Sequence, residues 1–118
     1  MNSIPMDDIF LHIYILIDDW YQEHATEFRK GQPGQKPEFS DSEVMTVMIA
    51  MDYIPFPSER QFVEFVRANY LVLFPNLLEQ SQFNRRARQV AHLLEGFRQS
   101  CLIELGVTLL NEGLLDTK

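Results

Sequence analysis

Positive charge is concentrated in one short run of the chain, Ser81-Gln82-Phe83-Asn84-Arg85-Arg86-Ala87-Arg88. We expect Ser81 to cap a helix that carries all three arginines in its first turns. Cations at that end face the positive pole of the helix macrodipole, and each is unfavourable by ~0.3–1 kcal/mol. Because the whole chain has a net charge of -7, cations gathered there indicate a function, and the phosphate backbone of DNA is the anion that they fit best.

Six residues are candidates for DNA binding on this pattern: Arg85, Arg88, Gln89 and His92 on the polar side of the expected helix, Arg86 on its flank, and Arg67 at a flanking phosphate. Lys30 and Lys36 could reach the same ligand from a preceding loop. The alternative, that the arginines pair with acidic neighbours, stays open. With 17 acidic against 10 basic side chains and a pI near 4.8, any nucleic-acid surface must be local.

Other chemistry-bearing residues give weaker patterns. The adjacent carboxylate pairs Asp7/Asp8 and Asp18/Asp19 diverge on a helix, which favours solvated positions. The three histidines have no partner at metal-ligand spacing, and the single Cys101 excludes an internal disulfide and makes a zinc site improbable. Read from the residues alone, Asp116 is a tail residue at what resembles the end of a strand.

Composition indicates one packed domain. The chain has 118 residues, 46% of them hydrophobic and 12% aromatic, which suits a real core rather than disorder. It has no apolar run of the ~18 residues that span a bilayer. Its start lacks the basic region of a signal peptide. We therefore expect a soluble, cytoplasmic protein with no membrane partner.

The fold class that the pattern predicts is all-α: a small bundle of about four helices with helix-turn-helix-like character and a frayed C-terminal tail. Residues 1–106 would form the helical domain, and residues 107–118 the tail. Apolar residues at three- and four-residue steps predict a helix from Pro5 to about Glu27. A loop rich in Gly and Pro follows from Arg29 to Glu38.

Further helices are marked by their caps. Ser40 with Glu43 forms a capping box before an apolar helix that we expect to be central, and Ser58 with Gln61 forms a second box. The Ser81 helix should continue to Gly106 with one inward face, consisting of Phe83, Ala87, Val90, Ala91, Leu94, Phe97 and Cys101. Leu11 and Ile15 fall off the core stripe of the first helix, as a second contact surface or as scattered exposed residues.

Several motifs occur in order along the chain: Phe39-Ser-Asp-Ser-Glu-Val-Met-Thr-Val-Met-Ile-Ala, Pro57-Ser-Glu-Arg-Gln-Phe, Leu73-Phe-Pro-Asn-Leu and Ser81-Gln-Phe-Asn-Arg-Arg-Ala-Arg. Together they resemble the N-terminal region of bacterial insertion-sequence transposases of the DDE class, whose catalytic domain has a ribonuclease H-like fold. The resemblance spans nearly the whole chain, and the Ser81 run is its most specific part.

The resemblance implies a role in DNA transposition with double-stranded transposon ends as partner. It also implies that Asp116, in Leu114-Leu-Asp-Thr-Lys118, is the first of three acidic metal ligands. Family members use a divalent metal, normally Mg²⁺, for phosphoryl transfer. The other two acids would lie beyond Lys118, so we expect this chain to be truncated, without a cofactor of its own and catalytically incomplete.

Two other functions stay open. One is a protein-interaction or dimerisation module without DNA binding, which would self-associate through Leu11, Ile15 and apolar surface left bare by the missing domain. The other, with less support, is a stand-alone metal-dependent enzyme.

Overall fold

Helices make up every regular element in the part of the chain that the computed structural model describes, residues 5–24 and 38–100. They are α1 (Met6–His24), α3 (Asp41–Tyr53), α4 (Glu59–Asn69), α5 (Gln80–Gln89) and a further helical segment over residues 91–100. The predicted all-α class and the prediction of about four helices are confirmed. Ser3, the loop lysines, Cys101, the 107–118 tail and Asp116 lie outside the described residues.

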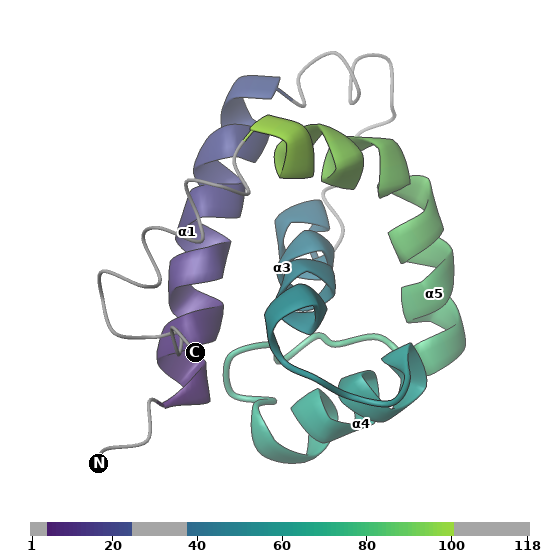
Figure 1. The fold of residues 1–118 in the computed structure, drawn as a ribbon. Coiled ribbons are helices and arrows are strands. Elements are labelled where there is room, and N and C mark those ends of the chain that lie inside the picture. The colour runs from purple at the N-terminus through teal and green to yellow at the C-terminus, as the bar shows by residue number, and fades with distance from the viewer. Residues whose placement is uncertain (1–4, 25–37, 101–118) are drawn as a thin grey trace.

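The helix α3 occupies the centre of the molecule (Figure 1). It packs against α1 on one side and against α5 on the other, and it also contacts α4. Eight of its 13 residues are buried, and Val44, Met45, Val47 and Ile49 are fully so. Thr46 is buried as well, and its hydroxyl donates to the Ser42 carbonyl at 2.7 Å. The prediction of a central helix, apolar nearly all round, is confirmed.

The start of α3 is fixed by the predicted capping box. The backbone N–H of Glu43 donates to Ser40 Oγ at 3.1 Å, and the Ser40 N–H donates to Glu43 Oε1 at 2.9 Å. These two bonds satisfy backbone donors that an uncapped helix would leave open. At α4 only half of the second box forms. Ser58 Oγ accepts from the Gln61 N–H at 3.2 Å, whereas the Gln61 side chain is exposed to solvent.

The first helix turns its apolar stripe inward as the spacing predicts. The buried residues of α1 are Ile9, Phe10, Ile13, Ile17, Trp20 and Tyr21. Phe10 meets two rings of the α4–α5 connection, Tyr70 at 5.5 Å and Phe74 at 5.2 Å between centroids. Edge-to-face contacts of this kind add to the area that the rings bury. Among the described helices, none has the length and apolar character that crossing a membrane requires.

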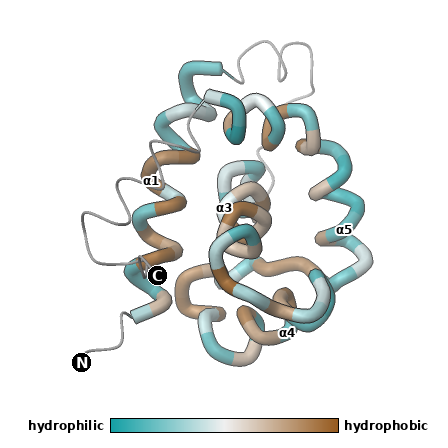
Figure 2. Tube along the Cα trace, in the orientation of Figure 1, coloured by the Kyte–Doolittle hydropathy of each residue, from teal (hydrophilic) through white to brown (hydrophobic). Residues whose placement is uncertain are grey.

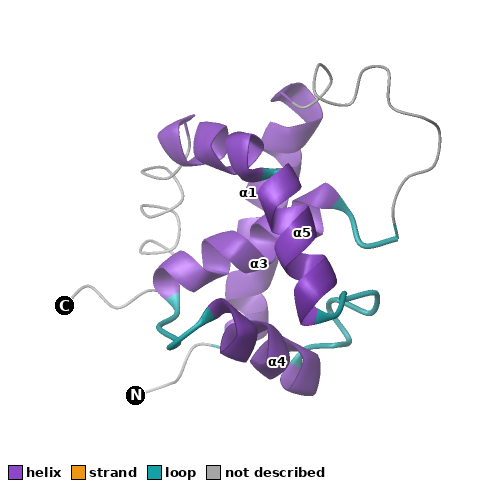
Figure 3. Ribbon diagram, turned by 90° about the vertical axis from the view of Figure 1, so that its right-hand side faces the viewer, coloured by secondary structure: helices purple, strands orange, loops and turns teal. Residues whose placement is uncertain are grey.

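The predicted continuous helix after Ser81 is wrong, because the chain changes direction at Val90 (Figures 1 and 3). Val90 is the C-cap of α5. A straight helix through residues 80–100 would extend about 30 Å and would carry its second half past the core. The bend instead buries Leu93, Leu94 and Phe97, and Phe97 meets Trp20 of α1 at 5.8 Å. The inward face shifts accordingly: Ala91, which was predicted to face inward, is exposed, and Leu93, which was not among the predicted inward residues, is buried.

Candidate nucleic-acid interface

The outer face of α5 is polar and cationic. Arg85, Arg88 and Gln89 are exposed, while Phe83 and Ala87 on the opposite face are buried in the core. Figure 2 shows α5 as mostly hydrophilic along its length. Within the part of the chain that the structure describes, neither Arg85 nor Arg88 forms a hydrogen bond or an ion pair. As far as residues 5–24 and 38–100 are concerned, their guanidinium groups can meet an anion from solvent.

The start of α5 differs from the prediction. The helix begins at Gln80 with Glu79 as N-cap, and Ser81 is an exposed first-turn residue rather than the cap. The amides of Gln80 and Asn84 both donate to Glu59 Oε1, at 2.9 and 3.1 Å. This shared carboxylate joins the first turns of α4 and α5. It binds side-chain amides rather than backbone N–H groups, and α5 has no side-chain cap.

The bend at Val90 also changes the electrostatic argument for the arginines. Because α5 has only 10 residues, Arg86 and Arg88 lie in its last turn. Cations are stabilised there by the negative pole of the helix macrodipole. The prediction that Arg86 and Arg88 are electrostatically unfavourable at a helix N-terminus is thus wrong. An unfavourable position can no longer serve as an argument that these two residues have a function.

Arg86 is engaged inside the protein. Its Nη2 lies 2.7 Å from Oδ1 of Asp41, and the other Asp41 oxygen accepts from the Tyr21 hydroxyl at 2.7 Å. The carboxylate is mostly buried, with 8% of its side chain exposed. An ion pair with this little exposure needs such additional bonds to offset its desolvation. Arg86 is therefore a link between helices, in line with the ion-pairing alternative.

Arg67 is also turned inward. Its guanidinium donates to the backbone carbonyls of Leu77 (3.4 Å) and Leu78. These bonds tie the end of α4 to the connection over residues 70–79. His92 is exposed and has an interaction within the protein. Of the six predicted residues, the structure brings Arg85, Arg88 and Gln89 together on one open face, and it gives Arg86 and Arg67 internal partners.

The α4–α5 arrangement departs from a tight helix-turn-helix. In that motif a turn of roughly three to four residues joins the two helices, whereas residues 70–79 separate α4 from α5 here. The connection has a turn of its own at residues 71–73. The two helices nevertheless pack against each other.

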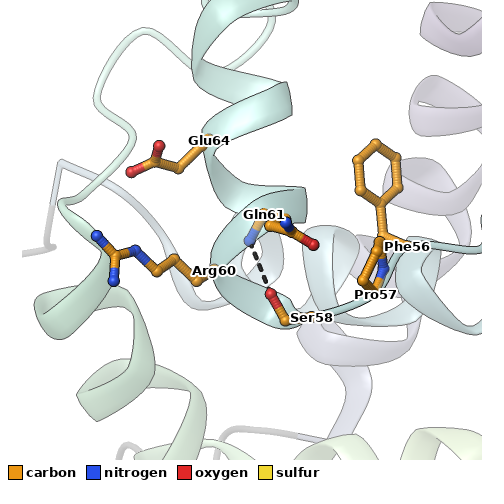
Figure 4. A pocket seen from close by; sticks show the side chains of 6 residues that line it. All are labelled: Phe56, Pro57, Ser58, Arg60, Gln61 and Glu64. Carbon is orange, nitrogen blue, oxygen red and sulfur yellow. Dashed lines mark hydrogen bonds between the residues drawn. The ribbon is translucent and has the colours of Figure 1, made fainter.

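A pocket lies at the start of α4 (Figure 4). It has a volume of about 660 Å³ and is lined by Phe56, Pro57, Ser58, Arg60, Gln61 and Glu64. The Ser58 hydroxyl already caps α4. The charged groups that line the pocket are Arg60 and Glu64. Such a pair offers no nucleophile with an adjacent base. No group of three or more metal-ligating side chains occurs within residues 5–24 and 38–100.

The role of Asp41 as a link between three helices was not predicted from the sequence. Its position next to Ser40 assigns it to the helix cap, and nothing local indicates its partner 45 residues away. Comparison with known proteins adds no functional assignment: no protein-family model, curated protein or solved structure matches the chain.

Proposed function

We propose that this chain is the N-terminal helical part of a transposase-type protein and that it contacts DNA through the outer face of α5. One observation carries the DNA contact. From Gln80 to His92 the chain has three arginines and no acidic residue, and two of these arginines, Arg85 and Arg88, are exposed and unpaired within the described residues. This is a local basic surface on a protein of net charge -7.

The support for α5 as a rigid platform comes from its inner side. Phe83 is fully buried, and the Arg86–Asp41 ion pair joins the helix to α3. A cation held on an anchored helix loses less freedom on binding than one on a loose segment. Arg85 and Arg88 therefore act as the phosphate contacts of the proposal, and Gln89 as a neutral hydrogen-bonding group beside them.

The expected binding is weak and modestly salt-dependent. Two phosphate contacts correspond to a slope of about -1.8 in log K against log salt concentration. The acidic remainder of the protein repels DNA and lowers the affinity further. The α5 face is thus one part of a DNA-binding surface rather than a complete one.

The test measures anisotropy of a labelled mixed-sequence duplex at several salt concentrations. The double variant Arg85→Gln/Arg88→Gln should weaken binding and reduce the salt slope by about 2. Arg98→Gln is the matched control, because Arg98 is paired with Asp52 at 3.1 Å on another helix; it should change little. Equal affinities and equal slopes for the native protein and the double variant would refute the assignment.

The catalytic part of the proposal concerns Asp116. In a longer protein of the resembled class it would be the first acidic ligand of Mg²⁺, the metal that supplies activation of the attacking oxygen. Asp116 lies outside the described residues, and the proposal for the α5 face does not depend on it.

A second candidate function is protein interaction without DNA binding. It is favoured by the exposure of Leu11 (52%) and Ile15 (48%) on α1. These are large apolar side chains one helical turn apart and therefore adjacent on the helix surface.

A further inference from the structure

The outer face of α1 carries two apolar side chains between two acidic pairs. Leu11 and Ile15 are four residues apart and therefore adjacent on one face. Asp7 and Asp8 lie one turn before them on that face, and Asp18 and Asp19 lie one turn after. All of these except Asp18 are exposed. Asp18 is half-buried, and its Oδ1 accepts from Ser42 Oγ of α3 at 2.9 Å and from the Gln22 amide at 3.3 Å, so only its other oxygen faces a ligand. The helix α1 contains no lysine or arginine. We call Leu11, Ile15 and these four acids the α1 stripe.

A groove runs beside the α1 stripe. It has a volume of about 240 Å³, its edges are Leu11 and Tyr14 on α1 and Leu73 on the α4–α5 connection, and Glu43 lies at its border. The groove is smaller than the roughly 300–1,000 Å³ of small-molecule sites, so it suits one or two inserted side chains. Val72, next to Leu73 in the sequence, is 93% exposed.

The electrostatics of the groove are negative as well. Burial, then the charges of Asp18 and Glu43, raise the pKa of the Tyr14 hydroxyl above its ordinary value. Both Tyr14, on which these charges act, and Glu43 line the groove. A ligand of this surface needs apolar side chains for its centre and cations for its ends.

We propose that the α1 stripe and its groove bind a basic amphipathic helix of a partner protein, with Leu or Ile side chains seated beside Leu11 and Lys or Arg side chains against the acidic pairs. This deepens the second candidate function and is independent of DNA contact by α5. Helices commonly dock in this way, with apolar anchors spaced three and four residues apart. Charge complementarity at the ends supplies register and specificity.

Other occupants fit the charges less well. A second copy that packed its own α1 stripe here would set acid against acid in either orientation, since both ends of the stripe are acidic. The chain after Ser100 carries Glu104, Glu112 and Asp116 against Lys118. Residues 29–37 are basic but have no aliphatic or aromatic side chain between the cations.

The test uses three labelled 18-residue helical peptides and the full chain. The first has leucines at three- and four-residue spacing and lysines elsewhere, the second replaces every lysine by glutamate, and the third replaces every leucine by serine. We expect measurable anisotropy changes with the first peptide only. Equal binding of the glutamate peptide or of the serine peptide would overturn the proposal, because either would show that one half of the proposed chemistry is not used.

Variants locate the site. Leu11→Ser/Ile15→Ser should lower the affinity for the first peptide about tenfold or more. Asp7→Asn/Asp19→Asn should lower it about two- to fivefold and make it less dependent on salt. The matched controls are Ala68→Ser/Ala91→Ser and Glu64→Gln/Glu95→Gln, exposed positions on other helices, which should stay within twofold. Controls that weaken binding as much as the site variants would overturn the assignment.

Two more measurements separate the competing occupants. Arg85→Gln/Arg88→Gln should keep its affinity for the peptide even if it no longer binds DNA. The two proposals can therefore fail independently, and the measurements distinguish which one has failed. Light scattering over a range of concentrations should show no dimer that Leu11→Ser/Ile15→Ser abolishes. Such a dimer would assign the α1 stripe to a second copy and overturn the proposal of a basic helix.

Discussion

Arg86 of α5 and Asp41 of α3 form an ion pair across 45 positions of sequence, with 2.7 Å between Nη2 and Oδ1. Tyr21 of α1 donates its hydroxyl to the same carboxylate. One side chain at the start of the central helix thus holds both of the helices that flank it. The pair lies behind the cationic face of α5 and fixes how that face is presented.

Removing the arginine should destabilise the fold. In Arg86→Met the Asp41 carboxylate keeps its bond to Tyr21 but loses its cation, and breaking a buried pair costs about 3–5 kcal/mol. We expect the lower part of that range, since 17% of the Arg86 side chain is exposed. The measurement is the free energy of unfolding in urea. Arg85→Met, an exposed neighbour, serves as control and should stay within about 0.5 kcal/mol.

A double-mutant cycle tests whether the loss comes from the stranded charge. Arg86→Met/Asp41→Asn should recover part of the stability lost in Arg86→Met, because the buried negative charge that Arg86 balances is removed as well. A double variant whose loss equals or exceeds the sum of the single losses would show that the ion pair is not the source.

The two capping boxes should respond differently when the residue at the third helical position, Glu43 or Gln61, is replaced. Ser40→Ala and Ser58→Ala should each destabilise by about 1 kcal/mol. At the third helical position, Glu43→Ala should also cost stability because its carboxylate accepts from the Ser40 N–H at 2.9 Å. Gln61→Ala should be nearly neutral. Urea unfolding of the four variants measures this, and a Gln61→Ala loss equal to that of Glu43→Ala would contradict the half-formed box.

Gly96→Ala tests the contact between residues 91–100 and α1. Alanine favours a helix over glycine by about 1 kcal/mol, but the new Cβ would lie 3.3 Å from two ring atoms of Trp20. That ring is held between His24, stacked at 4.6 Å, and Phe97. We expect a gain well below 1 kcal/mol and a changed emission of the single tryptophan. A full gain with unchanged emission would mean that the two helices are not in close contact.

Alkaline pH should weaken the fold through Tyr14. Its pKa is raised in the folded state, first by burial and then by Asp18 and Glu43. A group with a raised folded pKa contributes stability that is complete below its unfolded pKa of about 10 and is lost as the pH rises through the folded pKa. Unfolding in urea at pH about 9 and about 11 should show a smaller alkaline loss for Tyr14→Phe. The same loss in both proteins would argue against this cause.

The parts of the fold that depend on neighbouring residues were predictable from sequence. Residues three or four positions apart predict both the Ser40–Glu43 box and the buried face of α1. The central place of α3 follows from its apolar residues, which occur nearly all round the helix. The start of α5 was not predictable, because Glu59 of another helix binds Gln80 and Asn84 there. No glycine or proline lies at the bend at Val90, so the local sequence does not predict it. It follows from where the core lies, and that is a property of the assembled helices.

The candidate site shows the same division. Exposure of Arg85 and Arg88 follows from their place opposite Phe83 and Ala87. The inward turn of Arg67 and Arg86 does not, since their partners are backbone carbonyls and a carboxylate that only the tertiary fold brings near. Charge counts therefore identified the cationic helix but not which cations are available on it.

The bend at Val90 would limit the DNA that α5 could contact under the proposed function. A rod of 10 residues is about 15 Å long, close to the ~12 Å width of the major groove, so it can cross a duplex once. One helical turn of DNA is about 34 Å, and α5 spans less than half of it. His92 belongs to the next segment, which follows a different axis. Recognition of any longer DNA site would require a second reading element, in another domain or another subunit, placed at a fixed spacing from this one.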